Sequence, residues 1–201
     1  MAGRTSAQDV LAHELTSIHS AERQISRALP RLMRKISSDQ LRQMLDKRLS
    51  RGASLIDEID DVLDELEASK SRPKNLGAEG LIADATDLLE DTHDDSLIDP
   101  LVLASVQKLE HYCIAAWGTA AALGRLLDQD EAVNLMERVL HEGRRFDEEL
   151  TELAESEINR TMLQRSDEKE RAGTRDEDKG KRTRGKAGAL GSEGRKQGKS
   201  R

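Results

Sequence analysis

The chain has 201 residues, of which 35% are charged and 1% aromatic, with three prolines and a single cysteine. This composition favours long amphipathic helices and argues against a sheet protein, which would need more aromatic and β-branched residues. One cysteine excludes an intrachain disulfide, and no apolar run approaches the roughly 20 residues of a membrane span, so we expect a cytoplasmic protein without a membrane segment.

The net charge of −7 is unevenly distributed along the chain. Residues 179–201 carry nine Lys and Arg against Glu193 alone, so residues 1–178 together carry a charge of −15. An acidic body with a basic end raises the question of an anionic partner for that end.

The first predicted helix contains the apolar stretch of residues 11–36. Ser6 is a plausible N-cap for its start. Its apolar residues recur every three or four positions, at Leu11, Leu15, Ile18, Ile25, Leu29, Leu32 and Ile36. Glu22 fills the one gap in this apolar face. A lone carboxylate is costly to bury, so Glu22 requires a counter-charge, hydrogen bonds or a metal. Because the pattern continues past Pro30, we expect one kinked helix rather than two.

The second predicted helix runs from residue 41 to residue 68. Its core-facing positions are Leu41, Leu45, Arg48, Gly52, Leu55, Ile59, Val62 and Leu66. Arg48 and Gly52 therefore stand where apolar side chains are expected. The next section consists of a loop over residues 69–77, a short helix over 79–90 and an acidic loop over 91–95. This section is long enough to cross from one end of a helix bundle to the other.

The third helix is predicted to start at Asp99-Pro100, an N-cap followed by proline at the first helical position. Its core-facing positions are Leu103, Val106, Glu110, Cys113, Trp117, Ala120 and Leu127, and those of the fourth are Leu135, Val139, Glu142, Phe146 and Leu153. Three of the four long helices thus place one glutamate, Glu22, Glu110 or Glu142, in the middle of an apolar face.

The periodicity fades after Asn159, and residues 160–201 are rich in charged residues, Gly and Ser. We therefore divide the chain into a helical domain, residues 1–159, and a disordered tail, residues 160–201. The tail is either a solubilising segment or an electrostatic arm for nucleic acid, without sequence preference because it lacks aromatic residues. The candidate contacts are Lys179, Lys181, Arg182, Arg184, Lys186, Arg195, Lys196, Lys199 and Arg201.

A helix pair, a crossover and a second helix pair with inward glutamates form the layout of an all-α, ferritin-like four-helix bundle with a short crossover helix. In such bundles glutamates from all four helices, two of them in Glu-x-x-His pairs, hold two iron or manganese ions.

The sequence also resembles the bacterial YciE/YciF family of ferritin-like proteins, domain of unknown function 892, over residues 7–159. The matching stretches are Glu14-Leu15, Ala21-Glu22-x-Gln24, Ala28-Leu29-Pro30, Glu79-Gly80-Leu81-Ile82, Lys108-Leu109-Glu110-His111-Tyr112, Gly118-Thr119 and Asp147-x-x-Leu150-Thr151-x-Leu153-Ala154. The resemblance implies a ferritin-like bundle, a homodimer, and a link to bacterial stress responses without an established enzymatic reaction.

The chain departs from this family at the positions that matter for metal. Where the family has His-Leu-Glu-Glu-Thr in the second helix, the chain reads Arg48-Leu49-Ser50-Arg51-Gly52. Cys113 follows Glu110-His111-Tyr112 in place of a glutamate, and Arg145 stands three residues after Glu142 in place of histidine. The second helix thus loses its acidic ligands.

Two interpretations of the site remain open. In one, Glu22, Glu110 and Glu142 hold two iron or manganese ions, helped by His111 and Asp147. In the other, which we favour, there is no cofactor, and Arg48, Arg51 and Arg145 supply the counter-charge in a degenerate, structural site. Cys113 and Trp117 are interpreted as core filling, and His13, His19, His93 and His141 as surface residues.

The sequence therefore predicts a bacterial stress-associated ferritin-like protein that is not an enzyme. A metal-dependent protein that oxidises iron or removes peroxide is the first alternative. A nucleic-acid-associated protein acting through the basic tail is the second.

Overall fold

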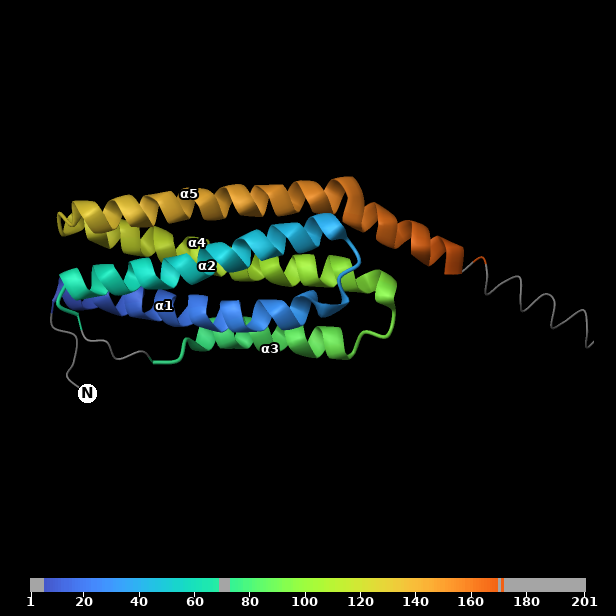
Figure 1. Cartoon of the computed structure of the whole chain (residues 1–201), viewed down its shortest axis with the longest axis horizontal. Helices are drawn as coiled ribbons and strands as arrows, with labels where there is room; N and C mark the ends of the chain where they lie inside the picture. The colour runs from blue at the N-terminus through green and yellow to red at the C-terminus, as the bar shows by residue number, and fades with distance from the viewer. Residues whose placement is uncertain (1–5, 69–72, 170, 172–201) are drawn as a thin grey trace, which may run out of the picture. The chain divides into compact units, whose positions relative to one another are not determined.

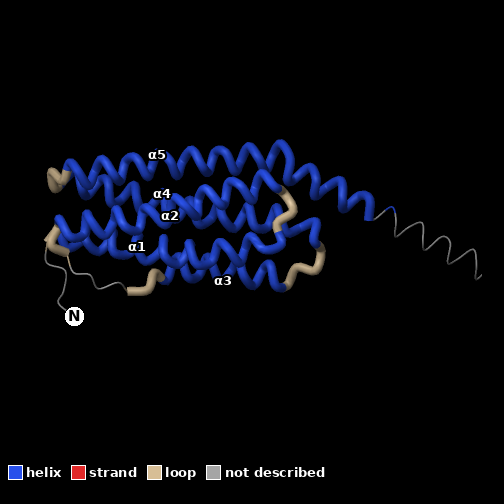
Figure 2. The backbone as a smooth tube through the Cα atoms, viewed as in Figure 1, coloured by secondary structure: helices blue, strands red, loops and turns tan. Residues whose placement is uncertain are grey.

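The structure is a computed structural model that describes residues 6–68, 73–169 and 171. Within residues 6–153, the described part of the chain contains five α-helices: α1 (Ala7–Leu32), α2 (Asp39–Glu65), α3 (Leu76–Glu90), α4 (Ile98–Leu126) and α5 (Asp130–Leu153). Short turns of other helix types follow α1, precede α4 and follow α5 (Met33–Lys35, Asp95–Leu97 and Ala154–Ile158). The described residues include no strand, as Figure 2 shows.

Within residues 6–159, the four long helices lie side by side, and α3 runs along α1 (Figure 1). α1 packs on α2, α4 packs on α5, and α1 and α4 join the two pairs. The crossover helix α3 covers α1 and α4, whereas α2 and α5 touch each other at only a few positions. The predicted ferritin-like bundle with a crossover helix is confirmed.

Side chains at the helix starts satisfy the free backbone N–H groups. Ser6 and Asp9 form a reciprocal capping box at α1, and the Ser38 hydroxyl accepts from the Leu41 amide at α2. The Asn75 side chain accepts from the Ala78 amide at α3, which starts three residues earlier than predicted. Such caps each contribute about 1 kcal/mol to helix stability.

The core lies where the apolar faces of α1 and α2 meet those of α4 and α5. Every core-facing position predicted for α1 and α2, Arg48 and Glu22 included, is buried. One boundary prediction is wrong, because α1 does not continue as an α-helix to Ile36 but ends at Leu32, two residues after Pro30. Proline lacks the N–H that would bond to the preceding turn, which weakens the helix at its end.

The prediction that Asp99 caps α4 is wrong, because that helix already begins at Ile98. Its carboxylate instead accepts hydrogen bonds from the backbone N–H groups of Ser37 (2.8 Å) and Ser38 (3.0 Å). The first turn of α4 thereby holds the connection between α1 and α2.

Residues 6–159 and 160–201 belong to two separate units. Residues 160–169 are helical rather than disordered, because they include good helix formers such as Met162, Leu163, Gln164 and Arg165. The basic stretch 179–201 lies outside the described residues. No helix of the described ranges is both long and apolar enough to cross a bilayer.

Candidate functional site

Two carboxylates are buried at the centre of the bundle. Glu22 of α1 is 1% exposed and Glu110 of α4 is 2% exposed. Each occupies a position at which the repeat of its helix places an apolar side chain. An unpaired ionised carboxylate in such a place is strongly unfavourable, so the surroundings must compensate both charges.

Arg48 of α2 supplies that compensation and is itself 3% exposed. Its Nη1 donates to Oε2 of Glu22 at 3.0 Å and its Nη2 donates to Oε1 of Glu22 at 3.1 Å. Its Nε donates to Glu110 Oε1. One planar guanidinium thus binds both carboxylates, a geometry that lysine cannot reproduce. We refer to Glu22, Arg48 and Glu110 as the buried cluster.

Arg48 keeps its positive charge in the buried cluster. Burial alone would lower its pKa, but the negative charges of Glu22 and Glu110 outweigh burial and raise the pKa of Arg48 well above its ordinary value. The cluster remains one charge short of neutral without a second cation.

Gly52, one turn after Arg48, makes room for this arrangement. A Cβ at this position would lie 3.0 Å from Arg48 Nη1, 3.2 Å from Ser26 Oγ and 3.4 Å from Glu22 Oε2. A side chain there would force the guanidinium and its neighbours to shift by a few tenths of an ångström. The glycine in the apolar face of α2 is therefore explained by the arginine beside it.

Arg51 is the second cation, and its side chain is 24% exposed. Its Nη2 lies 3.5 Å from Glu110 Oε2, and its guanidinium stacks 5.6 Å from the centre of the Phe146 ring. Burial, followed by the nearby charge of Arg48, lowers the pKa of Arg51, while Glu110 opposes this. Arg51 closes the buried cluster on the side that faces α5.

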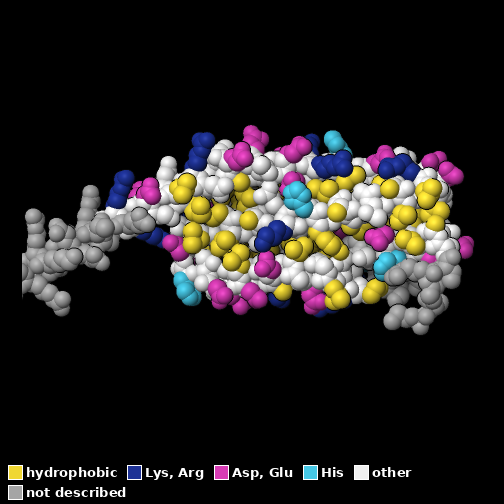
Figure 3. All heavy atoms as spheres, turned by 180° about the vertical axis from the view of Figure 1, so that it is seen from behind, with side chains coloured by type: hydrophobic (Ala, Val, Ile, Leu, Met, Phe, Trp, Pro, Cys, Tyr) yellow, Lys and Arg dark blue, Asp and Glu magenta, His cyan; other side chains and the backbone are white. Residues whose placement is uncertain are grey.

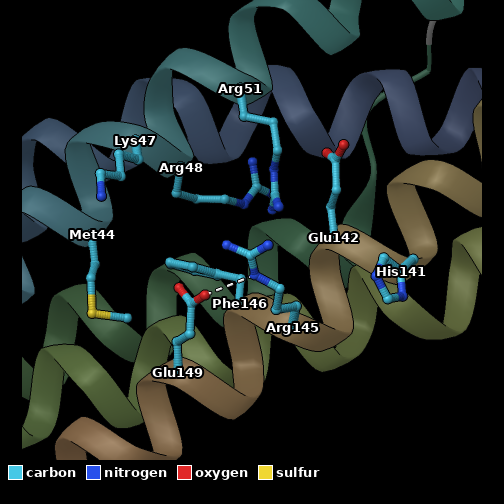
Figure 4. Close-up of a pocket in the computed structure, with 9 residues that line it drawn as sticks. All are labelled: Met44, Lys47, Arg48, Arg51, His141, Glu142, Arg145, Phe146 and Glu149. Carbon is cyan, nitrogen blue, oxygen red and sulfur yellow. Dashed lines mark hydrogen bonds and ion pairs between the residues drawn. The ribbon is translucent and has the colours of Figure 1, made fainter.

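The cluster lies beneath an open cleft of about 340 Å³ between α2 and α5. In Figure 4 the side chains of Arg48 and Arg51 approach that of Arg145 across this cleft, beside Phe146. Around the cluster itself, by contrast, only about 10 Å³ is open, which is room for at most one water.

Glu142 does not join the buried cluster, so the prediction that it occupies a core position is wrong. Its side chain is 37% exposed and lies 3.6 Å from Arg138. The neighbouring Gly143 takes the inward position, where a Cβ would be 3.4 Å from Ile114. Spacings of three and four residues both fit a helix face, and the small residue allows α5 to approach α4 closely.

Arg145, His111 and Asp147 also lie away from the buried cluster. Arg145 is 73% exposed and its Nε donates to Glu149 at 2.9 Å. The His111 side chain is 66% exposed and its Nε2 lies 3.3 Å from Asp147 Oδ2. The Arg145–Glu149 pair is exposed and of the kind that contributes little to stability, whereas Asp147 is only 16% exposed.

Cys113 lies beside the cluster, one turn after Glu110, and is 5% exposed. Burial first, and then the charge of Glu22, raises the pKa of the Cys113 thiol well above its usual value. A thiol that keeps its proton is a poor nucleophile and a poor metal ligand, so Cys113 acts as a small core residue.

The ferritin-like fold implies a pair of iron or manganese ions at this place, and the residues present do not fit them. Of the predicted ligands only Glu22 and Glu110 face the centre, and the Arg48 guanidinium already binds both. α2 contributes cations, and the inward residue of α5 is Gly143. Over the described ranges, no three His, Cys, Asp or Glu side chains are grouped as metal ligands.

Asn75 is a central polar residue that the sequence interpretation treated only as part of a loop. Besides capping α3, its Oδ1 accepts from the Tyr112 hydroxyl at 2.9 Å, and its Nδ2 donates to the carbonyl of Ser17 at 3.0 Å. Gly77 lets the Tyr112 ring approach, since a Cβ would meet it at 2.8 Å. An Asn just before a helix is an N-cap signal and could have identified this residue.

His19 was predicted to lie on the surface, but its side chain is fully buried. Its Nε2 lies 3.2 Å from Asp60 Oδ1, so it links α1 to α2 away from the buried cluster. The sequence offers one signal for this burial, since His19 directly follows the core residue Ile18 at the edge of the apolar face.

Comparison with known proteins agrees with this architecture. Residues 6–163 match the family model described as "Domain of unknown function (DUF892)". The protein YciF of Escherichia coli K12 is 36% identical over 154 residues, which cover 76% of this chain and 93% of YciF.

Two solved structures are also similar. The crystal structure of the E. coli stress protein YciF matches with a TM-score of 0.73 and 35% identity, covering 78% of this chain and 99% of that chain. YcfI of Rhodopseudomonas palustris matches with a TM-score of 0.70 and 29% identity, covering 73% and 94%. The chain therefore belongs to the DUF892 family of ferritin-like proteins, which includes YciF.

Proposed function

We propose that this chain is a bacterial stress-associated structural protein of the YciF type, in which an arginine replaces the metal ions of a ferritin-like centre. The observation that carries the proposal is the position of Arg48, whose guanidinium binds Glu22 and Glu110 at once. Stress association rests on the similarity to YciF, which is described as a stress protein.

The chemistry of the centre supports a structural rather than an enzymatic role. Iron oxidation or peroxide removal by a di-iron protein requires carboxylate and histidine ligands that leave coordination positions open. Here the buried carboxylates are bound to arginine, and the buried thiol keeps its proton. The cluster can fix the relative positions of α1, α2 and α4, but it presents no reactive group to a substrate.

Metal analysis tests this proposal directly. The purified protein is incubated anaerobically with Fe²⁺ or Mn²⁺, desalted, and assayed for metal per chain by plasma mass spectrometry. We expect far less than one ion per chain. Stoichiometric iron or manganese, lost on replacing Glu22 and Glu110 by Gln, would establish the metal-dependent alternative instead.

The chain also has a candidate dimer surface, in line with the homodimer that the family resemblance implies. The outer side of α4 exposes small and apolar residues, Ala104, Ala115, Ala122 and Leu126, among the polar Lys108, His111, Thr119 and Arg125. Viewed from behind, hydrophobic side chains gather along the middle of the bundle, with Lys or Arg, Asp or Glu, and His side chains among them (Figure 3). Exposed apolar residues that gather on one face are typical of an interface. Sedimentation equilibrium of the wild type and of an Ala115→Glu variant tests this, since the variant should be monomeric.

The basic stretch 179–201 supports a second candidate function, non-specific association with nucleic acid. Its charge of +8 contrasts with the acidic remainder, and such an arm binds phosphates through electrostatics alone. Replacing its nine Lys and Arg by Gln should weaken binding of a random duplex at low salt. Equal binding by both proteins would exclude the arm.

A further inference from the structure

The solvent-facing side of α1 carries a row of cations that the buried cluster and the tail leave unexplained. Between residues 23 and 35, every exposed residue is Arg or Lys except Pro30. The five cations are Arg23, Arg27, Arg31, Arg34 and Lys35, and we call them the α1 basic row. No acidic residue occurs between positions 23 and 38 of the sequence.

No ion pair joins the cations of the α1 basic row to a carboxylate, and Arg42, Lys47 and Arg144 also have no such partner within the described residues. Lys74, Lys108, Arg125, Arg138 and Arg145 each pair with Asp or Glu. None of the five side chains of the α1 basic row makes an ion pair or hydrogen bond within the described part of the chain. The row is therefore a continuous, uncompensated strip of positive charge.

Helix stability does not account for the row. Cations stabilise a helix only near its C-terminus, within about one turn, and Arg23 and Arg27 lie more than one turn before the end at Leu32. The steps from Arg23 to Arg27 and from Arg27 to Arg31 each place like charges four residues apart, which is weakly destabilising. An anionic partner would supply the negative charge that the row lacks among the described residues.

The spacing identifies the kind of partner. The steps of four residues correspond to about 6 Å along the axis, and Arg23 to Arg34 spans about 17 Å. One strand of a duplex advances about 3.4 Å per phosphate, so the row is as long as about five consecutive phosphates. Four of the five residues are arginine, whose planar fork binds phosphate bidentately.

A groove at the end of the row adds a concave element. Arg31, Arg34 and Lys35 line this groove, which has a volume of about 450 Å³ and contains one acidic residue, Glu90. The row itself exposes no large apolar side chain that would insert into a bilayer, which disfavours a lipid surface. We propose that the α1 basic row is a docking surface for the phosphate backbone of nucleic acid, separate from residues 179–201.

Screening makes this compatible with the acidic body. At physiological ionic strength a charge acts over about 8 Å, so the carboxylates on other faces of the bundle contribute little at the row. Binding should be independent of base sequence, because a row of cations on the backbone reads no base edge.

The experiment compares two full-length variants that lose the same number of charges. One changes Arg23, Arg27, Arg31 and Arg34 to Gln. The matched control changes four exposed cations elsewhere, Lys74, Lys108, Arg125 and Arg144, to Gln. Fluorescence anisotropy with a labelled random-sequence duplex gives the affinity as a function of salt, and circular dichroism verifies that both variants fold.

We expect the α1 variant to bind roughly tenfold or more weakly at low salt, with the slope of log affinity against log salt reduced by about 3 to 4. The control should retain most of the wild-type slope. Equal losses in the two variants, or no loss in either, would overturn the proposal. It would also be overturned if the α1 variant lost only binding to anionic vesicles, or only self-association with the acidic surface of another copy.

Discussion

Arg48 and Glu22 form a two-pronged pair inside the bundle, with Nη1 3.0 Å from Oε2 and Nη2 3.1 Å from Oε1. Neither side chain is more than 2% exposed. Because water cannot replace either partner, the consequence of losing one differs sharply from that of losing both.

Removing Arg48 alone should strongly reduce the stability of the folded protein. In Arg48→Met, Glu22 and Glu110 remain buried without their main counter-charge, and we expect a loss of about 3–5 kcal/mol in the free energy of unfolding by urea. Acidification should recover part of it by protonating the carboxylates. The triple variant E22Q/R48M/E110Q should be much closer to wild type. A triple variant as unstable as Arg48→Met would show that the ion pairs are not what holds the centre.

Gly52→Ala should destabilise the protein through contact with Arg48. The added Cβ would lie 3.0 Å from Nη1, and accommodating it should cost about 1–3 kcal/mol. Gly80 of α3 is the matched control, since a Cβ there meets nothing within 4 Å. Gly80→Ala should stabilise by about 0.5–1 kcal/mol through helix propensity. Thermal unfolding of both variants measures the difference, and equal effects would contradict the steric account.

Asn75 should be more important than an ordinary loop residue. Asn75→Ala removes the α3 cap and the bonds to Ser17 and Tyr112, so we expect a loss of about 2–3 kcal/mol. Tyr112→Phe removes only the hydroxyl donor and should cost about 1 kcal/mol. In chemical denaturation, the double variant should lose less than the sum of the two. Strict additivity would mean that the two side chains are not coupled.

Cys113 predicts a pH dependence with a definite sign. Because burial raises the pKa of the thiol in the folded state, the unfolded chain loses this proton first as the pH rises. Stability should therefore fall above about pH 8.5, by at most about 1.4 kcal/mol per pH unit. The difference in urea midpoint between wild type and Cys113→Ala, followed from neutral to alkaline pH, isolates this contribution. A constant difference would indicate that the thiol titrates normally.

Exchanging the two cations of α2 for metal ligands should restore metal binding. In Arg48→His/Arg51→Glu, Glu22 and Glu110 gain a histidine and a carboxylate in place of their counter-charges. Mn²⁺ should then raise the unfolding temperature of the variant, by mass action on the folded state, and leave that of the wild type unchanged. If Mn²⁺ instead raised the unfolding temperature of the wild type and not that of the variant, the wild type would have metal ligands other than Glu22 and Glu110.

The fold was accessible from the sequence because each long helix carries an apolar repeat, which is strongest in α1 and α5. The burial of Glu22, Arg48, Glu110 and Cys113 follows from steps of three and four residues, and the structure places all four inside. A periodic pattern constrains which face of a helix is inward even where the inward residue is charged.

The same pattern could not decide between neighbouring positions on α5. Glu142 and Gly143 both continue a helical face from Val139, and only the packing of α5 against α4 selects the glycine. Contacts between distant segments, such as Asp99 with Ser37 and Ser38, leave no periodic trace. They depend on how the loops meet in three dimensions, which a local pattern does not contain.

The position of Arg48 also bears on how the protein matures. A centre completed by a dissociable ion must be loaded after synthesis, is emptied by chelators and can take up the wrong element. The guanidinium that binds Glu22 and Glu110 is covalently part of the chain and arrives when α2 folds. Under the proposed function, this counter-charge is made with the chain itself, so the centre would form irrespective of the iron available in the cell.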